Sequence, residues 1–181
     1  MLIDMVARRP ASIYRNFERP FTRTSKKVQK INYIKGIPGN RIARYNIGNT
    51  KIDAEVEFSL VTIEDIQIRD LALEAMRVSA GAYIRKNVDD KQFHLKLNVI
   101  PHQILREHAQ AAVAQADRFY DGMRKPFGKP TGRAARVKAG QPVVTVRTLK
   151  GKDTIIKEAF RRAGDKVGCG TKIIKKDIVK K

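Results

Sequence analysis

The residues of this 181-residue chain best suited to chemistry lie between Asp117 and Arg147. In the first two-thirds of that stretch, cations alternate with glycines and prolines. No helix persists in such a pattern, so we expect the cations to sit on a loop. These cations are Arg118, Arg124, Lys125, Lys129, Arg133, Arg136 and Lys138. Glycine lets a backbone approach a phosphate closely, and Phe119, Tyr120 and Phe127 offer flat faces on which a base can stack. The pattern indicates phosphate and base binding, although an ordinary solvated surface loop is also compatible with it.

Residue types for catalysis or metal binding do not gather in the sequence. His94, His102 and His108 form no tight ligand pair, and His94 is expected to point outward from a strand. Cys169 lies in V-G-C-G-T-K, which lacks the order of a phosphate loop, and one cysteine builds neither a disulfide nor a zinc site by itself. No nucleophile has an adjacent base. We therefore predict no enzyme activity, cofactor, metal or small-molecule substrate; an RNA-modifying enzyme is the alternative that a measured turnover would revive.

A second run of cations occupies residues 1–44, with aromatic residues between them. Pro10 and Pro20 keep a helix from forming early. The candidate polyanion-binding residues here are Arg8, Arg9, Arg15, Arg19, Arg23, Lys26, Lys27, Arg41 and Arg44. We expect an extended basic arm that is poorly ordered alone and threads between the helices of a folded nucleic acid. An organelle transit peptide is the competing interpretation, but the two prolines spoil the amphipathic helix that such signals need.

The formal net charge is +20 and the pI is near 10.4. Residues 1–51 carry 12 Lys/Arg against 2 acids, 52–117 carry 7 against 11, and 118–181 carry 19 against 5. The cations therefore lie on both flanks of the chain. Their mutual repulsion destabilises a compact protein unless a polyanion neutralises it, which makes nucleic acid the leading partner. No apolar run approaches the ~20 residues that span a bilayer, so we expect no membrane partner. The single cysteine fits a reducing, cytoplasmic compartment.

Alternation of apolar residues predicts the strands that position these cations. The predicted strands span 44–48, 55–63, 93–100, 135–139 and 143–146. The last two are expected to be joined by a turn at Gly140-Gln141-Pro142. After Pro101, residues 102–105 are expected to resume the sheet, and 172–179 contain one further strand.

Two amphipathic helices are predicted. The first spans 65–86, with Glu64 and Asp65 at its positive N-terminal end. Its core-facing residues are expected to be Ile68, Leu71, Ala72, Ala75, Met76, Ser79, Ala82 and Tyr83. The second helix spans 153–164, with Gly164 as a C-cap.

This order of elements predicts an α+β fold, a two-layer α/β sandwich with a mixed or mostly antiparallel sheet. We divide the chain into an extended basic arm (1–44), an α/β domain (45–164) and a basic tail (165–181). Within the domain, residues 106–116 favour a helix but have little apolar bulk; a mobile projection and a further short core helix are both compatible with that composition. The tail suggests further contact with an anion, or a solvated terminus.

The run A-D-R-F-Y-D-G-M-R-K-P-F-G-K-P-T-G-R-A-A-R-V-K-A-G-Q (116–141) closely resembles the signature of a known family. That family is the universal large-subunit ribosomal protein number sixteen, in its archaeal and eukaryotic ten-e form. The supporting matches are R-R-P-A-S-I-Y-R (8–15), G-I-P-G-N-R-I-A-R-Y-N-I-G (36–48), L-E-A-M-R-V-S-A (73–80) and F-H-L-K-L-N-V-I-P-H (93–102). Together these motifs span most of residues 8–164, and the tail is not part of the pattern.

The resemblance implies an α/β sandwich that is a structural component of the large ribosomal subunit, located in the cytoplasm. It implies contacts with large-subunit ribosomal RNA, with neighbouring ribosomal proteins and, transiently, with tRNA near the aminoacyl site and the peptidyl transferase centre. Carried onto this chain, Arg8, Arg9 and Arg15 would thread into the RNA, and the cations of 118–138 would brace it from the other side. The tRNA-facing residues would be Arg106, Glu107, His108, Gln110 and Gln115. Because that segment is alanine-rich, we expect contact by shape more than by gripping phosphates. A DNA- or RNA-binding module that acts outside the ribosome is the other hypothesis.

Overall fold

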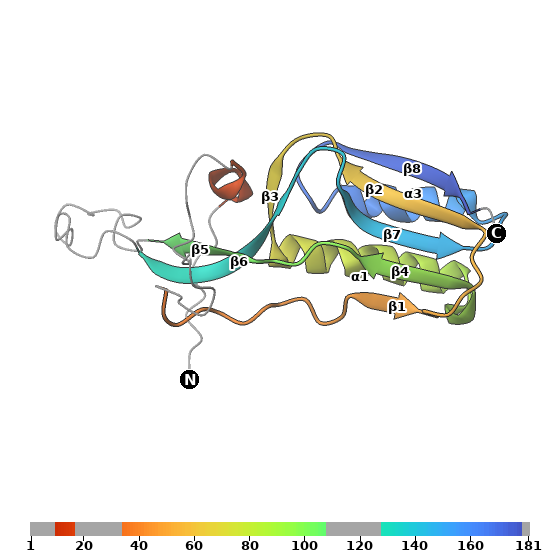
Figure 1. Ribbon diagram of the computed structural model, residues 1–181, viewed down its shortest axis with the longest axis horizontal. Helices are drawn as coiled ribbons and strands as arrows, with labels where there is room; N and C mark the ends of the chain where they lie inside the picture. Colours follow the sequence, from red (N-terminus) through yellow and green to blue (C-terminus); the bar gives the residue numbers. More distant parts are fainter. Residues whose placement is uncertain (1–9, 17–33, 108–127, 179–181) are drawn as a thin grey trace.

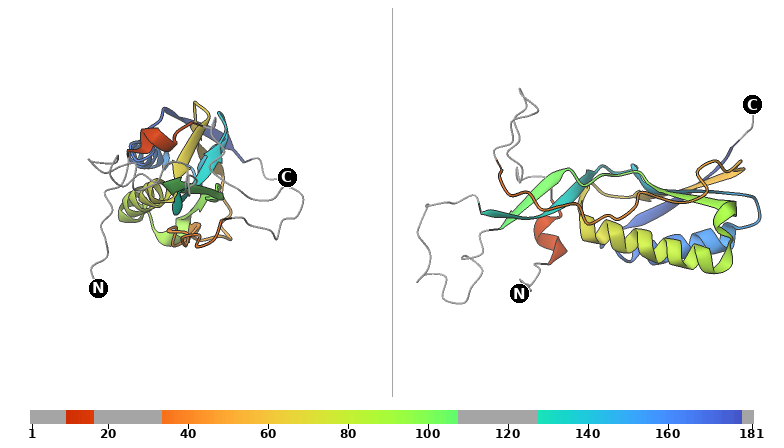
Figure 2. Two further views of the ribbon diagram at one scale, coloured as in Figure 1. Left: turned by 90° about the vertical axis from the view of Figure 1, so that its left-hand side faces the viewer. Right: turned by 90° about the horizontal axis from the view of Figure 1, so that it is seen from below.

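The computed structural model describes residues 10–16, 34–107 and 128–178. In these residues two α-helices cover one face of a five-stranded sheet, and a three-stranded sheet extends from one end (Figure 1). The helices α1 (Asp70–Asn87) and α3 (Asp153–Gly164) run side by side beneath the larger sheet (Figure 2). This arrangement confirms the predicted α+β class.

The larger sheet is antiparallel throughout its described strands. Its order is β1 (Asn46–Gly48), β4 (Phe93–Leu97), β7 (Pro142–Thr148), β2 (Val56–Thr62) and β8 (Thr171–Asp177). The strands predicted over 44–48, 55–63 and 93–100 are thus confirmed, each a few residues shorter than expected. A short 3-10 turn, Asp90–Gln92, leads from α1 into β4.

The hydrophobic core lies between this sheet and the two helices. From the sheet it takes Phe58, Leu60, Phe93, Leu95, Val144 and Val146, and from the helices Leu73, Met76, Ala80, Ile84, Ile156, Ala159, Phe160 and Ala163. Each of these side chains is at most 1% exposed. The alternation within each strand and the three- and four-residue steps within each helix are the periods that one buried face requires.

The start of α1 corrects the predicted boundary. The helix begins at Asp70, because residues Ile66–Arg69 form strand β3 instead of a first helical turn. Glu64 and Asp65 therefore precede β3, and Asp70 is the acidic residue in the first turn of the helix.

The buried face of α1 also differs from the predicted one. Of the residues expected in the core, Met76 alone is fully buried on the helix. Ser79 and Tyr83 line a groove between α1 and α3. A helix that touches both a sheet and a second helix has two partly apolar faces, and periodicity does not say which of them meets the sheet.

The smaller sheet has the order β3, β6 (Lys129–Val137) and β5 (Gln103–Glu107), again antiparallel. The predicted pairing of 135–139 with 143–146 is wrong, because β6 pairs with β3 and β5 while β7 pairs with β2 and β4. The intervening turn carries the chain from one sheet to the other. Its Gly140 has a φ of 77° and donates its amide to the carbonyl of Thr62 at 2.8 Å.

The end of the described chain belongs to the larger sheet. Strand β8 pairs with all seven residues of β2, which confirms the strand predicted near 172–179. The helix predicted over 153–164 is confirmed as α3. Gly164 ends that helix without a positive φ; a Cβ there would lie 2.6 Å from Oγ1 of Thr171, so glycine permits the close approach of β8.

Candidate nucleic-acid interface

Strand β6 carries three of the predicted RNA-binding cations into the smaller sheet. Lys129 opens the strand and is exposed, and Lys138, also exposed, follows its last residue. Arg133 and Arg136 lie between them and are half-buried. Lys129 and Arg133 were predicted on a loop but lie on the strand, because β6 starts five residues before the change in sequence pattern at Ala134. Arg136 lies within the strand predicted over 135–139, and Lys138 directly follows the observed strand.

Both half-buried arginines of β6 are held through Nε. Nε of Arg133 donates to the carbonyl oxygen of Pro38 at 2.8 Å, and Nε of Arg136 donates to Oε1 of Gln67 at 3.2 Å. Among the described residues, nothing accepts from the terminal nitrogens of Arg133. A guanidinium fixed through Nε keeps its outer edge for a second acceptor, and a phosphate matches that edge.

Residues 10–16 are attached to the edge of the smaller sheet. Tyr14 ends a 3-10 helix (Ala11–Tyr14) and is buried against Leu105 and Ala134. The amide of Gln67 donates to the carbonyl of Arg15 at 3.0 Å, and Nε2 of Gln67 donates to the carbonyl of Tyr14 at 2.7 Å.

The predicted RNA contact of Arg15 competes with an acid of the chain itself. Its guanidinium pairs with Glu64, with 2.6 Å between Nη2 and Oε2. Both side chains are more than a third exposed, so solvent screens this pair strongly.

The segment before β1 presents Arg41 and Arg44 to solvent. Buried Ile42 lies between them, and the next amide, that of Ala43, points to Glu74 Oε2 at 3.3 Å. Arg44 lines a hollow of about 620 Å³ together with three further cations, and Asp90 is the acid in that lining. Those cations are Arg77, Arg85 and Lys91.

Arg77 was not among the predicted site residues. It forms two hydrogen bonds with Glu74, and these bonds hold the pKa of that carboxyl below its usual range. The sequence did contain a signal for this pair, because residues three positions apart lie on the same face of a helix. The acid fixes the guanidinium beside Arg44.

The predicted tRNA-facing residues fall partly in β5. Arg106 and Glu107 are half-buried and pair in register with Pro130 and Lys129 of β6. The projecting segment predicted to begin at Arg106 therefore continues a strand for two residues. His108, Gln110 and Gln115 lie outside the described residues.

Nine of the predicted RNA-binding residues also lie outside the described part of the chain. They are Arg8, Arg9, Arg19, Arg23, Lys26, Lys27, Arg118, Arg124 and Lys125.

Within the described residues, the side chains suited to metal binding do not cluster. No group of three His, Cys, Asp or Glu side chains there is placed to hold an ion. His94 alternates with the core residues Phe93 and Leu95, as expected, but it is only 7% exposed and contacts Asn46 Oδ1 through Nε2 at 3.3 Å. It pairs in register with Gly48 and Arg147, and flanking strands on both sides cover it.

No described helix is long and apolar enough to cross a membrane.

Comparison with known proteins identifies the family of the chain. The model of the ribosomal protein L16p/L10e family matches residues 20–174. The chain belongs to this family. It is 46% identical over 169 residues to the large ribosomal subunit protein uL16 of Archaeoglobus fulgidus, with 93% of each chain covered. It is 43% identical over 171 residues to that of Staphylothermus marinus, with 94% of each covered. It is 42% identical over 163 residues to that of Methanocella arvoryzae, with 90% of this chain and 91% of the relative covered.

As a member of the L16p/L10e family, the protein is a structural constituent of the large ribosomal subunit, not an enzyme, and its place is in that subunit in the cytoplasm. Membership implies association with ribosomal RNA and with ribosomal proteins. The basic residues described above are therefore candidates for contacts within a ribonucleoprotein.

Proposed function

We propose that this chain binds large-subunit ribosomal RNA through the cations around the smaller sheet, and that it helps to shape the aminoacyl-tRNA corridor near the peptidyl transferase centre. The observation that carries the RNA contact is the set of cations along β6. Exposed lysines stand at its two ends, and an arginine fixed by Pro38 stands between them. Cations in such a row replace the counterions condensed on a nucleic acid backbone and release them to solvent.

Further candidate residues support the same surface. The segment that carries Arg41 and Arg44 touches β6 at Pro38, which accepts from Arg133, and then runs on to β1 beside the larger sheet (Figure 1). Residues 10–16 are held against β3, on the opposite edge of the smaller sheet from β5. Two regions that are 50 or more residues apart from β6 in sequence therefore meet at one end of the molecule. A site assembled in this way positions phosphate contacts in three dimensions, which suits a folded RNA better than a single strand.

The proposed tRNA contact rests on the pairing at the end of the smaller sheet. Because Glu107 pairs with Lys129, the chain between them leaves and re-enters the fold at one point, at the end farthest from α1 and α3. The candidate tRNA-facing residues follow directly from that point.

The RNA contact is tested by cosedimentation with large subunits that lack the endogenous protein. The variant R44Q/K129Q/K138Q removes three exposed charges that form no ion pair with a described residue. The matched control K96Q/K150Q/K172Q removes three exposed lysines from β4, a turn and β8. We expect the first variant to dissociate at clearly lower salt than the control and the wild type. Equal dissociation of the two variants would count against the proposed surface.

The tRNA contact is tested separately. Replacing residues 108–116 with a short Gly/Ser linker should leave cosedimentation unchanged and weaken aminoacyl-tRNA binding to the reconstituted subunits. Wild-type tRNA affinity in that variant would exclude the corridor role.

A further inference from the structure

The groove between α1 and α3 is a second concentration of positive charge, away from the smaller sheet. It has a volume of about 400 Å³ and runs along the helical layer. Its lining consists of Ser79, Ala82, Tyr83, Lys86, Arg162, Asp165 and Lys166. None of these residues belongs to the surface proposed above.

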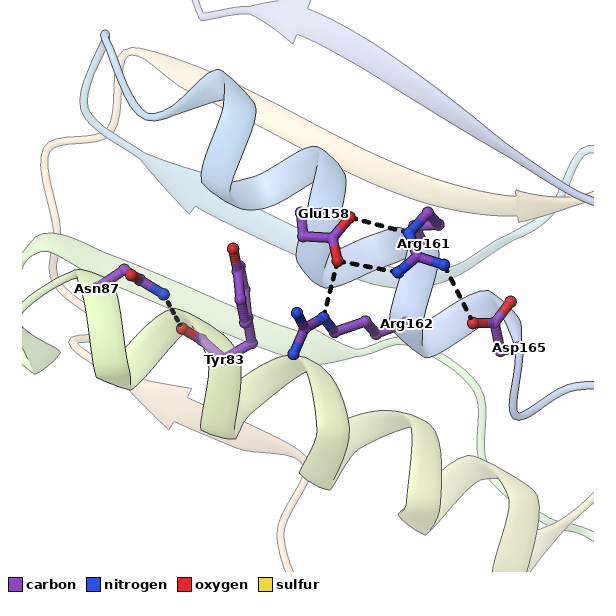
Figure 3. Close-up of polar contacts among 6 residues, drawn as sticks. All are labelled: Tyr83, Asn87, Glu158, Arg161, Arg162 and Asp165. Atoms are coloured by element: carbon purple, nitrogen blue, oxygen red, sulfur yellow. Dashed lines mark hydrogen bonds and ion pairs between the residues drawn. The ribbon is translucent and has the colours of Figure 1, made fainter.

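Arg162 is held in place at the edge of this groove. Its guanidinium lies 4.2 Å from the centroid of the Tyr83 ring, and its Nε donates to Oε1 of Glu158 at 2.8 Å (Figure 3). The same carboxylate accepts two hydrogen bonds from Arg161, at 2.9 and 3.0 Å. These two arginines hold the pKa of Glu158 at about 2, so the carboxylate stays ionised at any physiological pH.

The outer edge of Arg162 is available to a ligand. In the described part of the chain, no side chain or carbonyl accepts a hydrogen bond from its terminal nitrogens. Stacking on one side and an Nε bond on the other fix the plane of the guanidinium, so less side-chain entropy is lost when the outer edge binds an acceptor.

The two lysines of the groove are not neutralised by an acid of the described chain. Lys86 and Lys166 are exposed and have no ion-pair partner among the described residues. The acid in the lining, Asp165, lies 3.6 Å from Nη1 of Arg161 and so already faces a cation outside the groove. Three cations therefore line the groove with an excess of positive charge.

The chemistry of the groove favours a phosphate over a protein partner. Protein interfaces centre on a buried aromatic or aliphatic anchor, but the Tyr83 ring is already covered by Arg162. The other lining positions, Ser79 and Ala82, are small, so they let a backbone come close without offering apolar area.

We propose that the α1–α3 groove is a second RNA-binding surface, in which Lys86, Arg162 and Lys166 hold the phosphodiester backbone of ribosomal RNA. The proposal rests on the proposed function in that the partner is RNA, but it uses different residues on a different layer of the fold. The protein then grips RNA at two separated places, so RNA segments that meet both surfaces are held at a fixed distance.

The test is the salt dependence of binding between the full chain and deproteinised large-subunit ribosomal RNA. Each phosphate contact adds about 0.7 to 0.9 to the slope of log affinity against log salt. The variant K86Q/R162Q/K166Q should lower that slope by about 2, whereas K96Q/K150Q/K172Q should change it by much less. Because Arg162 also contacts Tyr83 and Glu158, the double variant K86Q/K166Q is measured as well. Neither lysine forms an ion pair with a described residue, and this variant should lower the slope by about 1.5.

The outcomes separate this inference from the proposed function. Binding by the wild type, with R44Q/K129Q/K138Q lowering the slope while both groove variants match the control, would overturn the groove alone. A wild type without salt-dependent RNA binding would overturn both proposals. Groove variants that keep the wild-type slope but no longer cosediment with large subunits would show that the groove meets a protein, which also overturns the inference. A reduced slope in both groove variants, with unchanged melting temperature in the double variant, supports it.

Discussion

Truncation of Tyr14 should release residues 10–16 from the smaller sheet and leave the rest of the fold intact. The side chain is 6% exposed, and its contacts with Leu105 and Ala134 form a small cluster separate from the main core. The guanidinium of Arg69 lies 5.8 Å from the centroid of its ring. Removing a buried aromatic side chain costs about 3–5 kcal/mol. A small cluster at the edge of the fold places the loss near the lower end, about 3 kcal/mol.

The amide proton of Gln67 reports directly on this attachment, because it donates to the carbonyl of Arg15. A loss of about 3 kcal/mol corresponds to an opening equilibrium more than about 100-fold larger. Hydrogen exchange followed by NMR should therefore show the Gln67 amide exchanging about 100-fold faster in Tyr14→Ala, while the amides of β2 stay protected. Ile13→Ala is the control, since Ile13 belongs to the same segment and is 53% exposed.

Two results would contradict this prediction for Tyr14. One is a Gln67 amide equally protected in Tyr14→Ala and the wild type, which would mean that the segment is held by something other than this ring. The other is an equal loss of protection in β2, which would mean that the small cluster is continuous with the main core.

Three further predictions follow from other parts of the molecule. Gly48→Ala should lower the free energy of unfolding by about 2 kcal/mol or more, because φ is 84° and the new Cβ would lie 2.3 Å from the carbonyl oxygen of Phe93. The control Gly140→Ala has a φ of 77° but no atom within 4 Å of the new Cβ, so it should cost only about 1 kcal/mol. Equal melting temperatures for the two variants would contradict this prediction. Burial lowers the pKa of His94, so the folded state favours the neutral ring. The stability that this gives is complete above pH ~6.5 and is lost as the pH falls below it. The melting temperature of His94→Gln should therefore change less between pH 7 and 5.5 than that of the wild type. A higher NaCl concentration should raise the melting temperature of the free chain, because salt screens the repulsion within a net charge of +20. The same change should weaken the binding of the chain to ribosomal RNA. A melting temperature that falls together with the RNA affinity would argue against uncompensated repulsion.

Elements whose pattern is local were predictable from the sequence. Helix α3 has the predicted bounds because its apolar residues form one continuous stripe, and that stripe is buried in the main core. Strands β2 and β4 were found by alternation, since each has one side against the helices. In these cases the residue pattern and the buried face carry the same information.

Elements that depend on distant pairing were not predictable in the same way. Ile66–Arg69 fits a helical pattern by composition but forms β3, because β6 supplies hydrogen bonds from about 70 residues further along the chain. The wrongly predicted pairing of 135–139 with 143–146 has the same origin, because the consecutive strands β6 and β7 pair with other strands in different sheets. Local propensity decides only when tertiary pairing does not compete with it.

The same distinction between local pattern and distant pairing applies to the candidate site. The types and spacing of the cations in 118–138 indicated a polyanion-binding surface, and Lys129 and Lys138 are exposed as a contact requires. What the sequence left out was which groups hold each cation. The bond from Arg133 to Pro38 joins residues 95 positions apart, and the pair of Arg15 with Glu64 joins residues 49 apart. No local pattern encodes either pairing.

These pairings change the meaning of the charge distribution along the chain. Several acids do not simply subtract from the net charge; Glu57 and Glu74 each accept from arginine side chains and set their orientation. In the described residues, by contrast, exposed lysines such as Lys86 and Lys166 form no ion pair. Arginine, with its planar fork, gains from being oriented, whereas the compact ammonium of lysine acts as a point charge that needs no orientation. The acidic middle of the sequence is therefore more than a neutral scaffold, because its carboxylates orient guanidinium groups. The unpaired lysines supply the long-range attraction that brings RNA to these oriented arginines.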